Sequence, residues 1–150
     1  MSNYFEATVN DDIEDSPRLF VTLRSGAFAG ESLAYFNPRI LEGESKVFSK
    51  MPIDIDETLV ISLGYLDRID HTRVADEHIG IRAKSAGIGD KVIVEVSLVQ
   101  EEIGAGFQGA RAMVRGRFLS TYGQLGDLSS GLGALARGEI DSVRFEEWIG

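Results

Sequence analysis

The sequence predicts an α+β fold in which a mainly antiparallel sheet carries two helices packed on one face. Several segments alternate apolar and polar residues with the period of two that is typical of half-buried strands. Two other segments follow a helix-capping signal and place apolar residues at helical spacing. The strands come in runs before each helix, which is typical of antiparallel meanders and not of alternating βαβ units.

Three strands are predicted at the start of the chain. Tyr4–Val9 and Arg18–Arg24 alternate clearly, and Glu31–Phe36 is a third run of the same kind. The segment Gly26–Gly30 separates the last two runs, so we expect a hairpin with a longer loop there.

A helix and a closing strand follow. Asn37 can cap a helix through its side chain, and Pro38 fits the first helical position, while Pro52 cannot continue the helix. The closing strand is Glu57–Tyr65, and Asp67–Glu77 then reads as a charged loop. The apolar stripe of this helix consists of Ile40, Leu41, Val47, Phe48 and Met51.

The second half repeats this order. His78–Ala83, Lys91–Val99 and Phe107–Leu119 are predicted strands, and Val143–Trp148 is the closing strand. Both halves therefore have the order strand-strand-strand-helix-strand, and we expect residues 1–150 to form a single α+β domain. The helix of the second half lies between its third strand and its closing strand. It begins with a capping-box pattern at Thr121 and Gln124 and ends at Gly138, and its apolar stripe consists of Leu125, Leu128, Leu132, Leu135 and Ala136.

The composition excludes several classes of protein. Hydrophobic residues make up 43% and charged residues 26% of 150 residues, which is typical of a folded domain. The absence of cysteine excludes disulfides, thiolate metal sites and catalytic thiols. No basic and apolar leader precedes the first strand, and no run approaches the roughly 20 apolar residues of a membrane helix. We therefore expect a cytoplasmic protein that does not enter a membrane.

The net charge of −9 is a better electrostatic match for a basic protein partner than for an acidic one, and the alternative interpretation is that the protein has no charged partner, as many acidic proteins do not. The same charge opposes binding to nucleic-acid phosphates, so no nucleic acid is expected. Arg111, Arg115 and Arg117 share one strand face, and we interpret them as cross-strand partners of carboxylates such as Glu95.

Three acidic segments are the candidate partner-binding sites. Solvated turns are the alternative interpretation of the same residues, because loops are commonly rich in charge. The candidate residues are Asp11, Asp12, Glu14, Asp15, Asp54, Asp56, Glu57, Asp67 and Asp70.

Catalytic and metal-binding patterns are weak. Gly26–Gly30 lacks the lysine and the following helix of a phosphate-binding loop, and no serine lies in a Gly-x-Ser-x-Gly elbow. His71 and His78 lie among carboxylates, but their spacing fits neither a zinc helix nor a calcium loop. We therefore expect no cofactor, no metal and no enzymatic activity.

The stretch from Phe28 to Asn37, read after the strand that ends near Leu23, resembles small bacterial proteins of unknown function that accompany polymorphic toxins. Some of those proteins are immunity proteins. The resemblance implies a small acidic protein that binds a toxin domain and blocks it, and it carries over no functional residue.

Two other functions stay open at this point. A small-molecule-binding or enzymatic domain would hold its ligand in a cavity between sheet and helices. A structural protein would assemble through exposed sheet edges.

Overall fold

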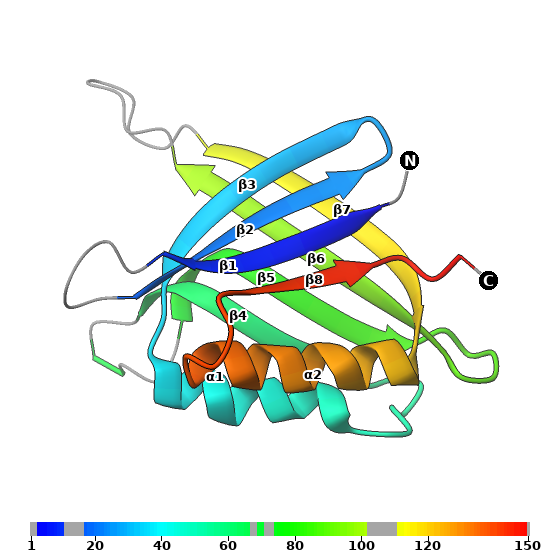
Figure 1. Cartoon of the computed structure of the whole chain (residues 1–150). Helices are drawn as coiled ribbons and strands as arrows, with labels where there is room; N and C mark the ends of the chain where they lie inside the picture. Colours follow the sequence, from blue (N-terminus) through cyan, green and yellow to red (C-terminus); the bar gives the residue numbers. More distant parts are fainter. Residues whose placement is uncertain (1–2, 11–16, 67–68, 71–73, 102–110, 150) are drawn as a thin grey trace.

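A computed structural model of the protein describes residues 3–10, 17–66, 69–70, 74–101 and 111–149 (Figure 1). In chain order its elements are β1 (Tyr4–Asn10), β2 (Arg18–Ser25), β3 (Phe28–Tyr35), α1 (Pro38–Ser45), the 3-10 helix η1 (Lys46–Ser49), β4 (Leu59–Leu66), β5 (Val74–Ser85), β6 (Lys91–Glu101), β7 (Arg111–Thr121), α2 (Tyr122–Ala136) and β8 (Ser142–Glu146).

The described strands form two antiparallel sheets of four strands each, and the α+β class is confirmed. Sheet A has the order β3-β2-β1-β8, and sheet B has the order β4-β5-β6-β7. Each half has the predicted strand-strand-strand-helix-strand order. The closing strand of each half nevertheless joins the sheet of the other half, since β4 pairs with β5 and β8 pairs with β1. This exchange links the two halves.

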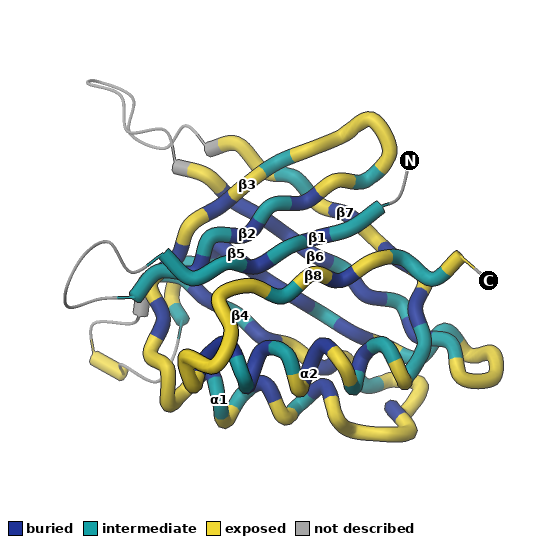
Figure 2. Tube along the Cα trace, in the orientation of Figure 1, coloured by how far each residue is buried: buried dark blue, intermediate teal, exposed yellow. Residues whose placement is uncertain are grey.

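The sheets face each other and share one hydrophobic core. On the strands of both sheets, alternate side chains point inward, and Figure 2 shows the resulting buried positions along each strand. Phe5 of β1 stacks on Phe145 of β8 with ring centroids 5.2 Å apart, and Phe118 of β7 lies 6.2 Å from Phe5. Strand β3 runs across all four strands of sheet B, as Figure 1 shows.

The helices lie along one side of this sandwich, near β8 and β4 (Figure 1). Their buried residues, among them Leu41 and Phe48 of the first helical segment and Leu125 and Leu132 of α2, join the core between the sheets. In the part of the chain that the structure describes, no helix covers the outer face of sheet A.

Local capping fixes where the helices begin, as the sequence predicts. The Asn37 side chain accepts hydrogen bonds from the backbone N–H groups of Arg39 and Ile40, at 3.0 and 3.4 Å. The Thr121 hydroxyl accepts one from the Gln124 N–H at 3.2 Å. Helix α2 ends before Gly138, whose φ of 76° is a conformation that favours glycine.

Two expected loops are shorter than the sequence pattern indicated. The expected loop Gly26–Gly30 is a tight turn, because Gly26 has a φ of 62° and β3 already begins at Phe28. Within the expected loop Asp67–Glu77, strand β5 already begins at Val74. The reason is that its pairing with β4 extends beyond the residues that alternate in the sequence.

The predicted stripe of the first helix is only partly buried. Leu41 and Phe48 are in the core, whereas Ile40 and Met51 are exposed. The α-helix ends at Ser45 and continues as the 3-10 helix η1, so residues after Ser45 no longer repeat with the spacing of an α-helix.

No helix among the described residues has the length and apolarity of a membrane-spanning helix.

Candidate binding groove

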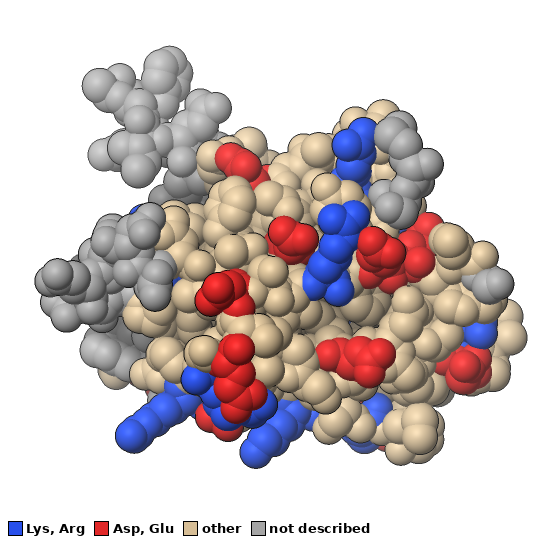
Figure 3. Space-filling view, viewed as in Figure 1, with Lys and Arg blue, Asp and Glu red and all other residues tan. Residues whose placement is uncertain are grey.

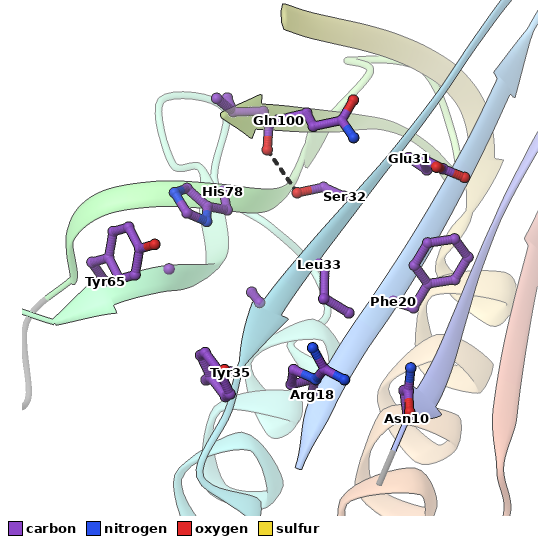
Figure 4. A pocket seen from close by; sticks show the side chains of 13 residues that line it. Asn10, Arg18, Phe20, Glu31, Ser32, Leu33, Tyr35, Tyr65, His78 and Gln100 are labelled. Atoms are coloured by element: carbon purple, nitrogen blue, oxygen red, sulfur yellow. Dashed lines mark hydrogen bonds between the residues drawn. The ribbon is translucent and has the colours of Figure 1, made fainter. Parts of the chain in front are cut away.

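A groove of about 530 Å³ lies beside β3, the last strand of sheet A (Figure 4). Sheet A contributes Asn10, Arg18, Phe20, Glu31, Ser32, Leu33, Ala34 and Tyr35 to its lining, and sheet B contributes Gly64, Tyr65, His78, Val99 and Gln100. Figure 1 shows that the ends of the sheet B strands reach past β3. The groove thus occupies the place where sheet B continues and sheet A stops.

The backbone of β3 has one edge that no other described strand pairs with. The Phe36 N–H donates to the Pro17 carbonyl at 3.2 Å, which marks these two residues as a hydrogen-bonded pair of the antiparallel ladder. Every second residue from Phe36 therefore directs its N–H and C=O toward β2, and the residues between them direct these groups away. The outward residues are Ala29, Glu31, Leu33 and Tyr35. We call their outward N–H and C=O groups the open edge of β3.

No hydrogen bond between described residues uses the open edge, because sheet A ends at β3 and no other described backbone group reaches it. Most backbone groups in folded proteins are paired, and those that are not normally face water. The open edge consequently offers donors and acceptors to a ligand.

A buried serine holds β3 against sheet B. The Ser32 hydroxyl donates to the Val99 carbonyl of β6 at 2.7 Å, as drawn in Figure 4. Farther along, the backbone of Gly30 packs so closely on Val114 of β7 that a side chain would collide with it. These two contacts fix the position of β3 and hence of the open edge.

Arg18 provides a cationic group in the groove. It lies on the outer face of sheet A, between Asn10 and Tyr35 in the strand register. Its Nε is buried, and among the described residues it has no hydrogen-bond partner. Because protein atoms cover the Nε, a ligand in the groove would meet the terminal guanidinium nitrogens, which form strong hydrogen bonds with carboxylates.

The sheet B side of the groove is shaped by an irregular pairing of β4 and β5. The register shifts between Leu63 and Gly64, and a side chain at Gly64 would collide with the Asp76 carbonyl. The shift places the rings of Tyr65 and His78 edge to face, with centroids 4.8 Å apart. His78 Nε2 lies 3.7 Å from the Asp76 carboxylate.

The basic side chains outside the groove are largely engaged within the protein. The Glu95 carboxylate oxygens lie 3.6 Å from Arg115 Nε and 3.8 Å from Arg117 Nε, which confirms the predicted cross-strand pairing. Comparable ion pairs hold Lys50, Arg82, Lys91, Arg137 and Arg144. Figure 3 shows acidic and basic side chains interspersed over the face of sheet A.

The predicted acidic segments have different positions. Asp11, Asp12, Glu14, Asp15 and Asp67 lie outside the described residues, and Asp70 is exposed. The chain enters the first of these segments at Asn10 and leaves it next to Arg18, and both of these residues line the groove.

The remaining candidates lie before β4, at the opposite end of that strand from Tyr65. Asp54 and Asp56 are exposed. Glu57 accepts hydrogen bonds from Lys50 Nζ at 2.6 and 2.7 Å, and this interaction lowers the pKa of Glu57. The structure therefore does not bring this acidic turn together with the groove.

Within the described residues, no three histidine or acidic side chains come close enough to hold a metal ion. His71 lies outside these residues, whereas His78 is buried on β5.

Sequence patterns did not identify the groove residues as a site. Arg18, Leu33 and Tyr35 lie in ordinary alternating strands, and only the strand order shows that β3 is an edge. The one sequence feature that pointed to a binding surface was the presence of Leu33 and Tyr35 on the solvent-exposed face of the strand, where polar side chains are usual.

The chain matches no family model, and comparisons with curated proteins and with solved structures gave no match.

Proposed function

We propose that the protein is a non-enzymatic binding module that holds a protein partner in the groove beside β3. The observation that supports this proposal is an exposed apolar and aromatic lining beside an open strand edge. Tyr35, Tyr65 and Leu33 are 53%, 54% and 37% exposed, although they border a concave surface. Aromatic side chains of this kind commonly anchor protein interfaces, surrounded by a polar rim.

The charge of the protein favours a basic partner. The net charge is −9, and the described basic side chains are mostly paired with carboxylates, so the excess charge is acidic. Long-range attraction of this sign accelerates association and selects against acidic competitors. Inhibition of a basic bacterial toxin, as in immunity proteins, is the specific form of this proposal, and it rests on the sequence resemblance.

The test is affinity capture with a matched pair of variants. Leu33→Lys places a charge in the groove, and Leu119→Lys places the same charge on β7 at a leucine of nearly equal exposure, 39%. We expect the wild type and Leu119→Lys to capture the same basic protein from native extract, with capture weakening as salt rises. Leu33→Lys is expected to bind that protein more than tenfold more weakly.

Equal capture by Leu33→Lys and the wild type would contradict the proposed location. If rising salt did not weaken capture, the proposed electrostatic attraction between the protein and its partner would be contradicted.

A second candidate function is binding of a small carboxylate-containing molecule. The groove volume lies in the range typical of small-molecule sites, and Arg18 and His78 supply polar groups in it. The groove lies at a sheet edge, away from the sheet and helix interface where the sequence placed such a cavity. Thermal unfolding with a panel of small carboxylates tests this function, since a bound ligand raises the melting temperature.

A further inference from the structure

The open edge of β3 is long enough to pair with another strand. Strand β3 has 8 residues, and its outward groups come from Ala29, Glu31, Leu33 and Tyr35. An unpaired strand edge of this length is a template for a further strand, and natural proteins commonly shorten, cover or charge such edges. Here the outward side chains include Leu33 and Tyr35, and only Glu31 carries a charge.

The groove provides space for that strand. A neighbouring strand lies about 4.8 Å from its partner in the plane of a sheet. On the open side of β3 this position falls in the groove, above the parts of sheet B that carry Tyr65, His78 and Gln100. Alternate side chains of an added strand would face these residues, and the others would lie beside Leu33 and Tyr35.

Arg18 specifies the chemistry of one side chain. It lies one strand inward from β3, yet its side chain reaches the groove, where its guanidinium is the cationic group of the lining. A carboxylate is the acceptor that a guanidinium binds most strongly. A bound segment with an aspartate or glutamate on its outer face would supply it.

We infer that the groove binds an extended segment of the partner as a fifth strand of sheet A, with a carboxylate of that segment paired with Arg18. This inference rests on the proposed function and adds the binding mode and the chemistry of the segment. A partner that is basic overall can carry such a local acidic residue, because net charge governs encounter and the contact governs specificity.

The probe is a displayed library of linear peptides of about ten residues, selected on the immobilised full-length protein. Enriched peptides are synthesised, and their dissociation constants are measured by fluorescence polarisation. We expect alternating apolar residues and one acidic residue in the enriched sequences.

Two substitutions at one position separate backbone pairing from side-chain contact. Glu31→Pro removes an N–H of the open edge that β2 does not use, so the fold tolerates it, as edge strands tolerate proline. Glu31→Ala keeps the N–H and removes only the carboxylate. We expect Glu31→Pro to bind peptides more than tenfold more weakly than Glu31→Ala does, because the two variants share the loss of the carboxylate and differ in the N–H, with both variants showing the wild-type circular dichroism spectrum.

Arg18→Gln tests the carboxylate contact. We expect it to weaken binding of the acidic peptide about tenfold, and to weaken much less the binding of the same peptide with glutamine in place of its acidic residue. An equal loss for both peptides would overturn the pairing with Arg18.

The outcomes distinguish this inference from the proposed function. If Leu33→Lys abolishes capture of the partner but Glu31→Pro binds partner and peptides normally, the groove is the site and strand addition is wrong. If no peptide is enriched and the wild type forms dimers that Glu31→Pro does not, the occupant is a second copy and the inference is overturned. Tight binding of free acetate or glutamate without peptide enrichment would instead indicate a small carboxylate.

Discussion

The two edges of sheet A are treated differently by the rest of the protein. At one edge, β8 is only 5 residues long, and α2 packs beside it. The Gln124 side chain of α2 donates to the Glu146 carbonyl of β8 at 3.2 Å, and Gly131 approaches Val143 closely. At the other edge, β3 has 8 residues and lies beside a groove.

This difference indicates which edge is structural and which is available for binding. A short edge covered by a helix is protected from pairing with other chains, whereas a long uncovered edge is not. Sheet A therefore has a closed edge at β8, beside which α2 packs, and an open edge at β3, where we propose that a partner binds.

The largest expected effect is a difference in stability between leucines at the two edges. Leu128 of α2 is buried beside Val143 and Phe145 of β8, so Leu128→Ala should lower the free energy of unfolding by about 2–5 kcal/mol. Leu33→Ala, at the open edge, should cost about 1 kcal/mol or less because its side chain is exposed. Urea unfolding of both variants measures this, and equal losses would show that the open edge is also structural.

Two buried serines allow a comparison of equivalent hydrogen bonds. Ser32 donates to Val99 at the open edge, and Ser129 of α2 donates to the Ser45 carbonyl of α1, both at 2.7 Å. Replacing either by alanine leaves a buried acceptor with one hydrogen bond fewer and should cost about 1–3 kcal/mol. Only Ser32→Ala should also weaken binding in the groove, because the Ser32 bond helps to position β3 and the Ser129 bond lies between the helices. If both serine variants bound the partner as tightly as the wild type, the hydrogen bond between Ser32 and Val99 would not be needed for binding in the groove.

Two glycines of α2 test how closely the helix approaches β8. Gly126 has no atom within 4 Å of an added Cβ, so Gly126→Ala should stabilise the protein by about 1 kcal/mol through helix propensity. At Gly131 the added carbon would lie 3.0 Å from Val143, and this crowding should offset the gain. Thermal unfolding compares the two variants, and a full gain in Gly131→Ala would mean that α2 can move away from β8.

The smallest expected effects are electrostatic and have opposite signs. Burial raises the pKa of Glu44 on α1 above 4.5, so its ionisation reduces stability as pH rises through that pKa. The Lys50 ammonium lowers the pKa of Glu57, so the stability it contributes is present above pH 4.5 and is lost as pH falls through the lowered pKa.

At pH 7, Glu44→Gln should therefore raise the melting temperature slightly, and Glu57→Gln should lower it slightly. Both differences should disappear in acid, below the pKa values of both folded-state carboxyl groups. A melting-temperature series across acidic and neutral pH measures them, and shifts of the same sign would contradict the assigned causes.

The sequence was sufficient for features that depend on neighbouring residues. The caps at Asn37 and Thr121 were predictable because the side chain bonds to backbone groups two or three residues away. The alternation in β1 and β2 likewise predicted which residues are buried, since successive strand residues face opposite sides.

The candidate site could not be derived in this way. Whether Leu33 lies in the centre of a sheet or on its open edge depends on which strand follows β3 in space, and β4 joins sheet B instead. Arg18 gives no local sign that its side chain will reach the groove, with its Nε buried and without an acceptor among the residues that the structure describes. The acidic residues chosen from composition proved to have separate positions where they are described, because charge in a sequence does not fix distance in the fold.

By itself, the sequence thus determined the types of the elements, their order and the inward faces of α2 and of strands such as β1 and β2, all of which follow from local periodicity and capping. Only the tertiary structure decided that β4 and β8 exchange between the halves, that α2 covers β8, and that β3 remains an open edge beside a groove. The physical reason is that strand pairing uses backbone groups that nearly every residue possesses. The choice of partner therefore depends on the packing of the whole core and not on any short stretch of residues.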